Sequence, residues 1–235
     1  MQSSLLNILS INKEFKIDGY VVKNITINEI PTLETINEFN YVIITGGDGA
    51  IRRTIKNFRD KFEIDNIPPI ILNPTGSFNV IVKYYRPITI DKIIKKLITN
   101  ENLKTLKAPI YAIDKKIFLF SVGNSGDVAH IFISEVLRFG YLKSGFIRYA
   151  ISMLVLMPFH LFITPFLLIS KQRFFVFTPF GFFKKFFNIY GRVDEDIEIN
   201  LGNYYNVLEF DGDLSVVKKQ HITIKRVGSI DLVIG

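Results

Sequence analysis

The sequence predicts an α/β region followed by a β-rich region, so we expect its 235 residues to form two domains. Strand and helix patterns alternate over residues 1–104, which is typical of a parallel sheet covered by helices on both faces. Strand patterns dominate residues 105–235, apart from an apolar, helix-like segment near 145–170. We therefore expect an N-terminal parallel α/β domain and a C-terminal antiparallel, sandwich-like domain.

The amino-acid composition excludes some kinds of site and favours some kinds of partner. The chain has no cysteine, which excludes disulfides and thiolate metal ligands and fits a reducing compartment. The first residues lack the charged region and cleavage site of a secretion signal, so we expect a cytoplasmic protein. The net charge of +7 predicts a negatively charged partner, and nucleotide, nucleic acid and anionic lipid all fit that charge.

Apolar periodicity predicts the elements of the first domain in order. We expect helices over 5–15, 32–39, from 51 onward and over 88–98, alternating with strands over 20–27, 41–44 and 70–72. A parallel sheet of this kind binds its ligands at the carboxyl ends of its strands.

Two loops follow the strands over 41–44 and 70–72. Gly46-Gly47-Asp48-Gly49 can bring several backbone N–H groups onto one anion, and the dipole of the helix that follows adds to the attraction. The second loop, 73–79, contains Ser77 and Asn79, whose side chains can donate hydrogen bonds to phosphate oxygens. Each loop also has a simpler interpretation as a turn, so the residues alone leave both alternatives open.

The first loop resembles the nucleotide loop of the diacylglycerol kinases, the sphingosine kinases and their bacterial lipid-kinase relatives, and more distantly that of the NAD kinases. That loop usually ends in Thr, whereas this chain has Ala50. The second loop resembles the lipid kinases' Pro-x-Gly-Thr-x-Asn-Asp loop. Pro74, Gly76 and Asn79 match it, Ser77 keeps the hydroxyl of the expected Thr, and Val80 replaces the expected Asp.

Two further segments resemble the second domain of this family. Gly126, Asp127 and Ala129 align with a Gly-x-Gly-x-Asp-Ala segment near the lipid hydroxyl, although Asp127 could instead cap a helix. Asp211-Gly212-Asp213 stands where the family has Asp-Gly-Glu, and the resemblance implies that Asp213 and Asp211 hold Mg²⁺. A hairpin turn is the alternative for Asp-Gly.

The apolar stretch 149–169 has three open interpretations: a transmembrane span, a buried helix, or an apolar surface against lipid. Pro158 and Pro165 would interrupt a spanning helix. The basic, aromatic segment 182–190 fits nucleic acid or a membrane interface. We favour the membrane and no nucleic acid, because nothing else resembles a nucleic-acid-binding module.

The resemblance implies an ATP-dependent lipid kinase that phosphorylates diacylglycerol or a similar lipid, with the active site in the cleft between the two domains. Gly46, Gly47, Asp48, Gly49, Gly76, Ser77 and Asn79 would hold ATP. Asp48, Asp213 or both would serve Mg²⁺ and the general base, and the sequence does not separate these two roles; Asp127 would orient the acceptor hydroxyl.

The chain departs from the family, because its usual first strand and Asn-Pro-x-Ser-Gly turn are not recognised in the sequence. We therefore expect a reduced or truncated version. A catalytically weak nucleotide- or lipid-binding homologue and an NAD kinase-like enzyme are the alternatives. Expected partners are the lipid substrate and the surface of an anionic membrane, contacted peripherally, and a homodimer stays open.

Overall fold

The computed structural model describes residues 6–76, 79–120, 122–123, 147, 151–152, 154–155, 157–158, 176–177, 190–191, 196–201, 204–211 and 213–235. The chain forms two compact units. The first contains Met1–Ile110 and Gly228–Gly235, and the second contains Tyr111–Val227. The domain division expected from the sequence, 1–104 and 105–235, stays a prediction.

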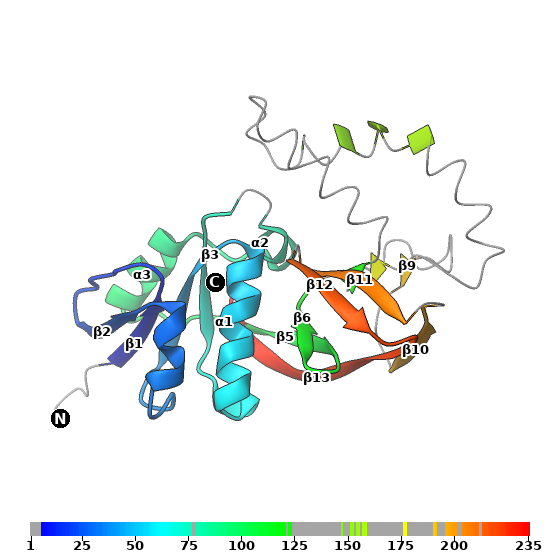
Figure 1. The fold of residues 1–235 in the computed structure, drawn as a ribbon. Helices are drawn as coiled ribbons and strands as arrows, with labels where there is room; N and C mark the ends of the chain where they lie inside the picture. Colours follow the sequence, from blue (N-terminus) through cyan, green and yellow to red (C-terminus); the bar gives the residue numbers. More distant parts are fainter. Residues whose placement is uncertain are drawn as a thin grey trace. The chain divides into compact units, whose positions relative to one another are not determined.

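The first unit is built on parallel strands, shown in blue to cyan-green in Figure 1. Their bounds are β1 Leu6–Ile11, β2 Tyr20–Ile25, β3 Tyr41–Gly46 and β4 Ile70–Pro74. They lie in the order β2-β1-β3-β4, and each neighbouring pair is parallel. The end of β13 (His221–Val233) adds a further parallel strand, with Leu232 opposite Ile70.

Helices cover this sheet on both faces (Figure 1). They are α1 Asp48–Lys61, α2 Val80–Tyr85 and α3 Ile90–Ile98, with short 3-10 helices η1 Ile27–Thr32 and η2 Ile64–Asn66. Helix α3 buries Ile93 and Leu97 against Ile8, Ile43 and Ile71 of the strands. Helix α1 buries the apolar side chains of Ile51, Ile55 and Phe58 together with the polar Thr54. The parallel α/β architecture is therefore confirmed.

The helix predicted over 5–15 is wrong, because Leu6–Ile11 forms strand β1 between β2 and β3. A strand in the middle of a parallel sheet is buried on both faces, so its apolar run lacks strict alternation and resembles a buried helix. The sequence analysis did not recognise a first strand before the glycine loops, and β1 corrects this expectation.

The helix predicted over 32–39 is also wrong. The structure has η1 instead, which ends at Thr32. A capping box starts it: the carboxylate of Glu29 accepts hydrogen bonds from the backbone N–H and the hydroxyl of Thr26, at 2.6 and 2.7 Å. These two bonds, the backbone one first, lower the pKa of Glu29. Local capping thus shifted the helical turn toward the N-terminus of the predicted range.

The second unit is rich in strands. They are β5 Thr105–Ile113, β6 Lys116–Phe118, β7 Val122–Gly123, β8 Val176–Phe177, β9 Tyr190–Gly191, β10 Ile197–Asn200, β11 Tyr205–Phe210 and β12 Asp213–Lys218. Strands β5 and β13 begin in one unit and end in the other. A separate sheet has the order β12-β11-β7-β8-β9, and its first three pairings are antiparallel. The β-rich second region is therefore confirmed.

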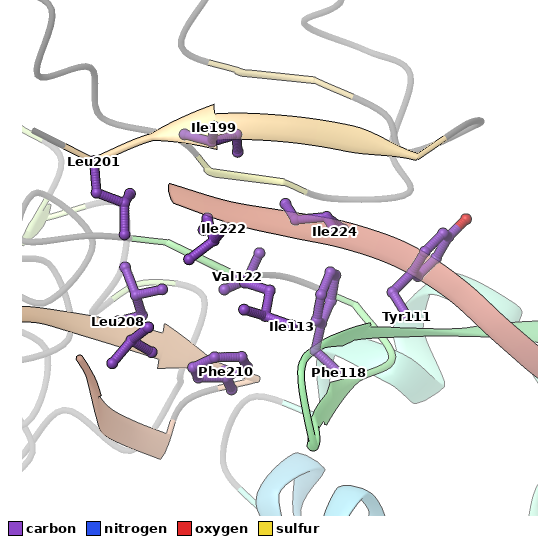
Figure 2. Packing of buried hydrophobic residues seen from close by; sticks show 11 residues of the cluster. Tyr111, Ile113, Phe118, Val122, Ile199, Leu201, Leu208, Phe210, Ile222 and Ile224 are labelled. Carbon is purple, nitrogen blue, oxygen red and sulfur yellow. The ribbon is translucent and has the colours of Figure 1, made fainter. Parts of the chain in front are cut away.

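Apolar residues from both sheets meet in one core within the second unit (Figure 2). Ile222 and Ile224 of β13 pack in the same cluster as Leu208 and Phe210 of β11. The ring of Phe118 lies 6.4 Å from that of Phe210, centroid to centroid. This two-layer packing is the sandwich-like arrangement that the sequence predicts.

Most of the apolar segment near 145–170 and of the basic, aromatic segment 182–190 lies outside the described residues. In the part of the chain that the structure describes, no helix is both long and apolar enough to span a bilayer.

Candidate functional site: two glycine loops in contact

The two predicted glycine loops start side by side, because they follow neighbouring parallel strands. Gly46 at the end of β3 pairs with Pro74 at the end of β4. The backbone N–H of Thr75 donates to the carbonyl of Gly46 at 3.1 Å. Just before the loops, the buried Asn73 side chain donates from Nδ2 to Thr45 Oγ1 at 3.0 Å. These bonds fix both loops to the carboxyl edge of the sheet, where a parallel sheet binds ligands.

The two loops touch through glycine. A Cβ placed on Gly76 would lie 2.6 Å from Gly47 Cα, and a Cβ placed on Gly47 would lie 3.2 Å from Gly76 Cα. The first distance is too short for any other residue without a shift of the backbone. Because neither position carries a side chain, the two backbones pack directly against each other.

Helix α1 begins inside the first loop. Gly47 is its N-cap, and the N–H of Ile51 donates to the Gly47 carbonyl at 3.0 Å, which closes the first helical turn. The backbone N–H groups before Ile51 lie ahead of the intrahelical hydrogen bonds, and the dipole of this 14-residue helix makes its start attractive to anions. Gly47 has no side chain that could occupy this position. The loop therefore fits a phosphate group.

Asp48 connects the first loop to the helix that follows the second. Its Oδ1 accepts a hydrogen bond from the backbone N–H of Ile81, in the first turn of α2, at 3.0 Å. Ile81 is itself buried. The Asp48 carboxylate therefore holds the start of α2 beside the first loop. Its predicted role in catalysis stays a prediction.

Asn79 lies where the second loop enters α2 and has a left-handed backbone with φ of 47°. Its Nδ2 donates to the carbonyl of Gly76, which closes the loop on itself. Its Oδ1 is buried and has no hydrogen-bond partner within the described ranges of the chain. A buried acceptor in this state can take a donor from a ligand. Ser77, the other predicted polar contact of this loop, lies outside the described residues.

Asn12 is a residue at this edge that the sequence analysis missed. It follows β1 with a left-handed backbone, φ of 65°. Its Oδ1 accepts from the N–H of Ile27 at 3.0 Å, and its Nδ2 donates to the carbonyl of Thr45 at 3.4 Å. Asn12 thereby braces the residue that precedes the first glycine loop. An Asn directly after an apolar run was the available signal, since Asn tolerates the left-handed conformation.

Three acidic residues of the second unit, Asp211, Asp213 and Asp127, were also predicted as site residues. Asp211 is buried, and its two carboxylate oxygens accept the backbone N–H groups of Leu119 and Phe120 at 2.7 and 2.8 Å. Asp213 starts β12 and is half-buried. Asp127, with its neighbours in the predicted motif, lies outside the described residues.

The described residues do not assemble a magnesium site. Among them, no three His, Asp or Glu side chains lie close enough together to hold a metal ion. Each carboxylate oxygen of Asp211 already accepts one backbone N–H. The assignment of Asp211 and Asp213 as metal ligands stays a prediction.

No protein-family profile matches the chain, and no curated protein matches it in sequence. Among solved structures, a protein from Bacillus anthracis str. Sterne assigned as a diacylglycerol kinase matches 100% of this chain and 99% of its own, with a TM-score of 0.56 and 11% identity. This chain has the fold of that protein. The identity is low, so the match establishes the fold alone.

Two further solved structures are similar to the chain. A diacylglycerol kinase from Bacillus anthracis str. Sterne is 15% identical with a TM-score of 0.40, and the match covers 59% of this chain but only 55% of that one. An NAD kinase from Archaeoglobus fulgidus in complex with ATP is 12% identical with a TM-score of 0.43, over 97% of this chain and 92% of that one.

Proposed function

We propose that the chain is an ATP-dependent lipid kinase, which transfers the γ-phosphate of ATP to a hydroxyl of diacylglycerol or a similar lipid. The observation that carries the proposal is the contact between Gly47 and Gly76 at the carboxyl ends of β3 and β4. It occurs in a fold shared with a protein assigned as a diacylglycerol kinase.

The two loops would bind ATP through its phosphates. Backbone N–H groups at the start of α1, from Gly47 to Gly49, would donate to phosphate oxygens, and the helix dipole would favour the negative charge. Asn79 offers a buried Oδ1 that could accept a hydrogen bond from the nucleotide or its bound water. ATP supplies the phosphoryl group, and the protein contributes position and charge stabilisation.

The lipid acceptor is supported by the surface chemistry of the chain. Leu154, Val155 and Met157, inside the predicted apolar segment, are all exposed. Together with the net charge of +7, such side chains favour peripheral contact with an anionic membrane from the cytoplasmic side.

Asp213 and Asp127 are the carboxylates proposed to act on the acceptor hydroxyl, Asp213 as general base and Asp127 as the group that orients it. We expect Asp213→Asn to lower the rate of phosphoryl transfer at least about a hundredfold, because the amide cannot take the proton. The folded state should keep its stability, since Asp213 is only half-buried. An unchanged transfer rate would remove Asp213 from the mechanism.

The deciding experiment is transfer of labelled phosphate from ATP and Mg²⁺ to acceptors tested side by side. Diacylglycerol, monoacylglycerol, sphingosine and polyprenol would be presented in mixed micelles, and NAD in solution. Label in one lipid supports the proposal and names its substrate. Label in NAD alone would instead assign an NAD kinase-like activity.

A catalytically weak binding protein is the second candidate, and two observations favour it. Ala50 and Val80 lack the polar groups that the kinase loops carry at these positions. Both carboxylate oxygens of Asp211 are hydrogen-bonded to backbone N–H groups, which is a structural role. ATP binding without transfer to any acceptor would establish this alternative.

A further inference from the structure

The register of the β11–β12 hairpin places four apolar side chains on one face. Directly opposed residues of antiparallel strands share a face, and here Tyr205 opposes Lys218 and Val207 opposes Val216. Leu214, opposite Glu209, belongs to the same face. The exposed fractions are 68% for Tyr205, 47% for Val207, 52% for Leu214 and 54% for Val216. We call these four residues the hairpin face.

The hairpin face is exposed but apolar, whereas the exposed face of a sheet is normally polar. Leu208 and Phe210, on the other side of β11, already supply the buried core. An antiparallel sheet normally pairs such a core face with a polar outer face. Moreover, β12 is the edge strand of its sheet, where exposed apolar residues promote association. A contiguous apolar patch in this position marks a binding surface.

Two lysines lie near the hairpin face: Lys218 beside Tyr205, and Lys116 at the Val216 carbonyl, where its ammonium group also lies 5.9 Å from the ring of the core residue Phe210. The ammonium group of Lys218 lies 5.8 Å from the centroid of the Tyr205 ring. The ammonium group of Lys116 donates to the carbonyl of Val216 at 2.8 Å. Glu209, the acidic residue in the same register, is buried. The face therefore combines apolar side chains and a Tyr ring with positive charge nearby.

We propose that the hairpin face docks on the surface of an anionic lipid bilayer. Apolar side chains and a Tyr ring would enter the boundary between headgroups and acyl chains, while the lysines contact anionic headgroups. A second copy of the chain is disfavoured, because a two-fold contact through this face would bring the same lysines together. The inference deepens the proposed function, because a kinase acting on lipids must reach the bilayer.

The test is sedimentation of the full chain with vesicles, without ATP. The vesicles contain either phosphatidylcholine alone or phosphatidylcholine with phosphatidylglycerol. We expect binding to the anionic vesicles, weakened about tenfold or more in the double variant Val207→Thr, Val216→Thr, which keeps the shape and β-branching of both side chains. Lys218→Gln should weaken the same binding about fivefold and reduce its salt dependence.

Val21→Thr is the matched control, because Val21 is a 52% exposed valine on strand β2 of the other unit. Its vesicle binding should equal that of the wild type. Unchanged binding of the double variant would overturn the proposal. A wild-type dimer in solution that the double variant abolishes, without any vesicle binding, would assign the face to a second copy and also overturn it.

This outcome is separable from that of the proposed function. If no acceptor is phosphorylated while the hairpin variants still lose vesicle binding, the docking proposal is supported and the proposed kinase activity is contradicted. If phosphate is transferred to lipid in micelles while the variants bind vesicles as the wild type does, the proposed kinase activity is supported and the docking proposal is contradicted.

Discussion

At the level of single residues, the Asp48 side chain links the two loops. This structural role does not depend on a role of Asp48 in catalysis. Its Oδ1 accepts the N–H of Ile81, and this bond joins the start of α1 to the start of α2. Removal of the acceptor leaves the N–H of the buried Ile81 without its partner, whereas an amide at the same position still offers an oxygen.

We therefore expect Asp48→Ala to lower the free energy of unfolding by about 1–2 kcal/mol and Asp48→Asn by less than about 1 kcal/mol. Urea unfolding of both variants measures the difference. Equal stability of the two variants would show that the bond to Ile81 does not hold the loops together.

Asp211 is a second carboxylate with a structural role. Its two oxygens accept the N–H groups of Leu119 and Phe120, and these charge-assisted bonds tie the turn after β11 to the residues after β6. We expect Asp211→Ala to destabilise the fold by about 3 kcal/mol, because two backbone donors lose their acceptor. Chemical denaturation measures this change.

Asp114→Asn is the control for Asp211, since it removes an exposed ion pair with Lys219. Its effect should stay within about 0.5 kcal/mol. If both substitutions had the same small effect, the Asp211 carboxylate would not be needed by the fold.

At the scale of elements, β13 depends on a glycine at the point where it passes from the second unit to the first. Gly228 has φ of +147°, and a Cβ there would lie 2.8 Å from Cδ1 of Ile64. The strand pattern of the sequence is broken at Gly228, whereas the structure has one continuous strand, His221–Val233. Gly228 made the pattern look interrupted, since glycine usually weakens a strand.

Gly228→Ala should lower the free energy of unfolding by about 1–3 kcal/mol, because it adds backbone strain and a contact with Ile64. Adding Ile64→Ala removes that contact but leaves the strain. The double variant should therefore lose less than the sum of the two single changes, as measured by thermal and urea unfolding. Strict additivity would show that the Cβ does not meet Ile64.

At the scale of the whole molecule, the sequence predicts the two-part architecture and both glycine loops, because these signals are local. Apolar periodicity and short glycine motifs act within a few residues of each other. Strand β1 was misassigned because burial on both faces removes the alternation that identifies a strand. The short helix α2 was not predicted at all.

The candidate site was only partly predictable, because its decisive contacts join distant residues. The sequence identified Gly47 and Gly76 separately, but their direct contact depends on the pairing of β3 with β4. The bond from Ile81 to Asp48 and the two bonds to Asp211 likewise connect residues from separate elements. A motif gives the residue type, whereas only the fold shows which groups of that residue are already bonded.

Equilibrium titration of ATP tests most directly whether the contact between the two glycine loops forms the proposed ATP site. A Cβ on Gly76 would lie 2.6 Å from Gly47 Cα and must push the loops apart, whereas a Cβ on Gly47 would lie 3.2 Å from Gly76 Cα. Gly235→Ala is the matched control, because a Cβ there has nothing within 4 Å. We predict that the wild type binds ATP, and that Gly76→Ala weakens binding about tenfold or more. Gly47→Ala should weaken it less, and Gly235→Ala should leave it unchanged. Equal ATP affinity in all four proteins, or no binding by the wild type, would contradict the account.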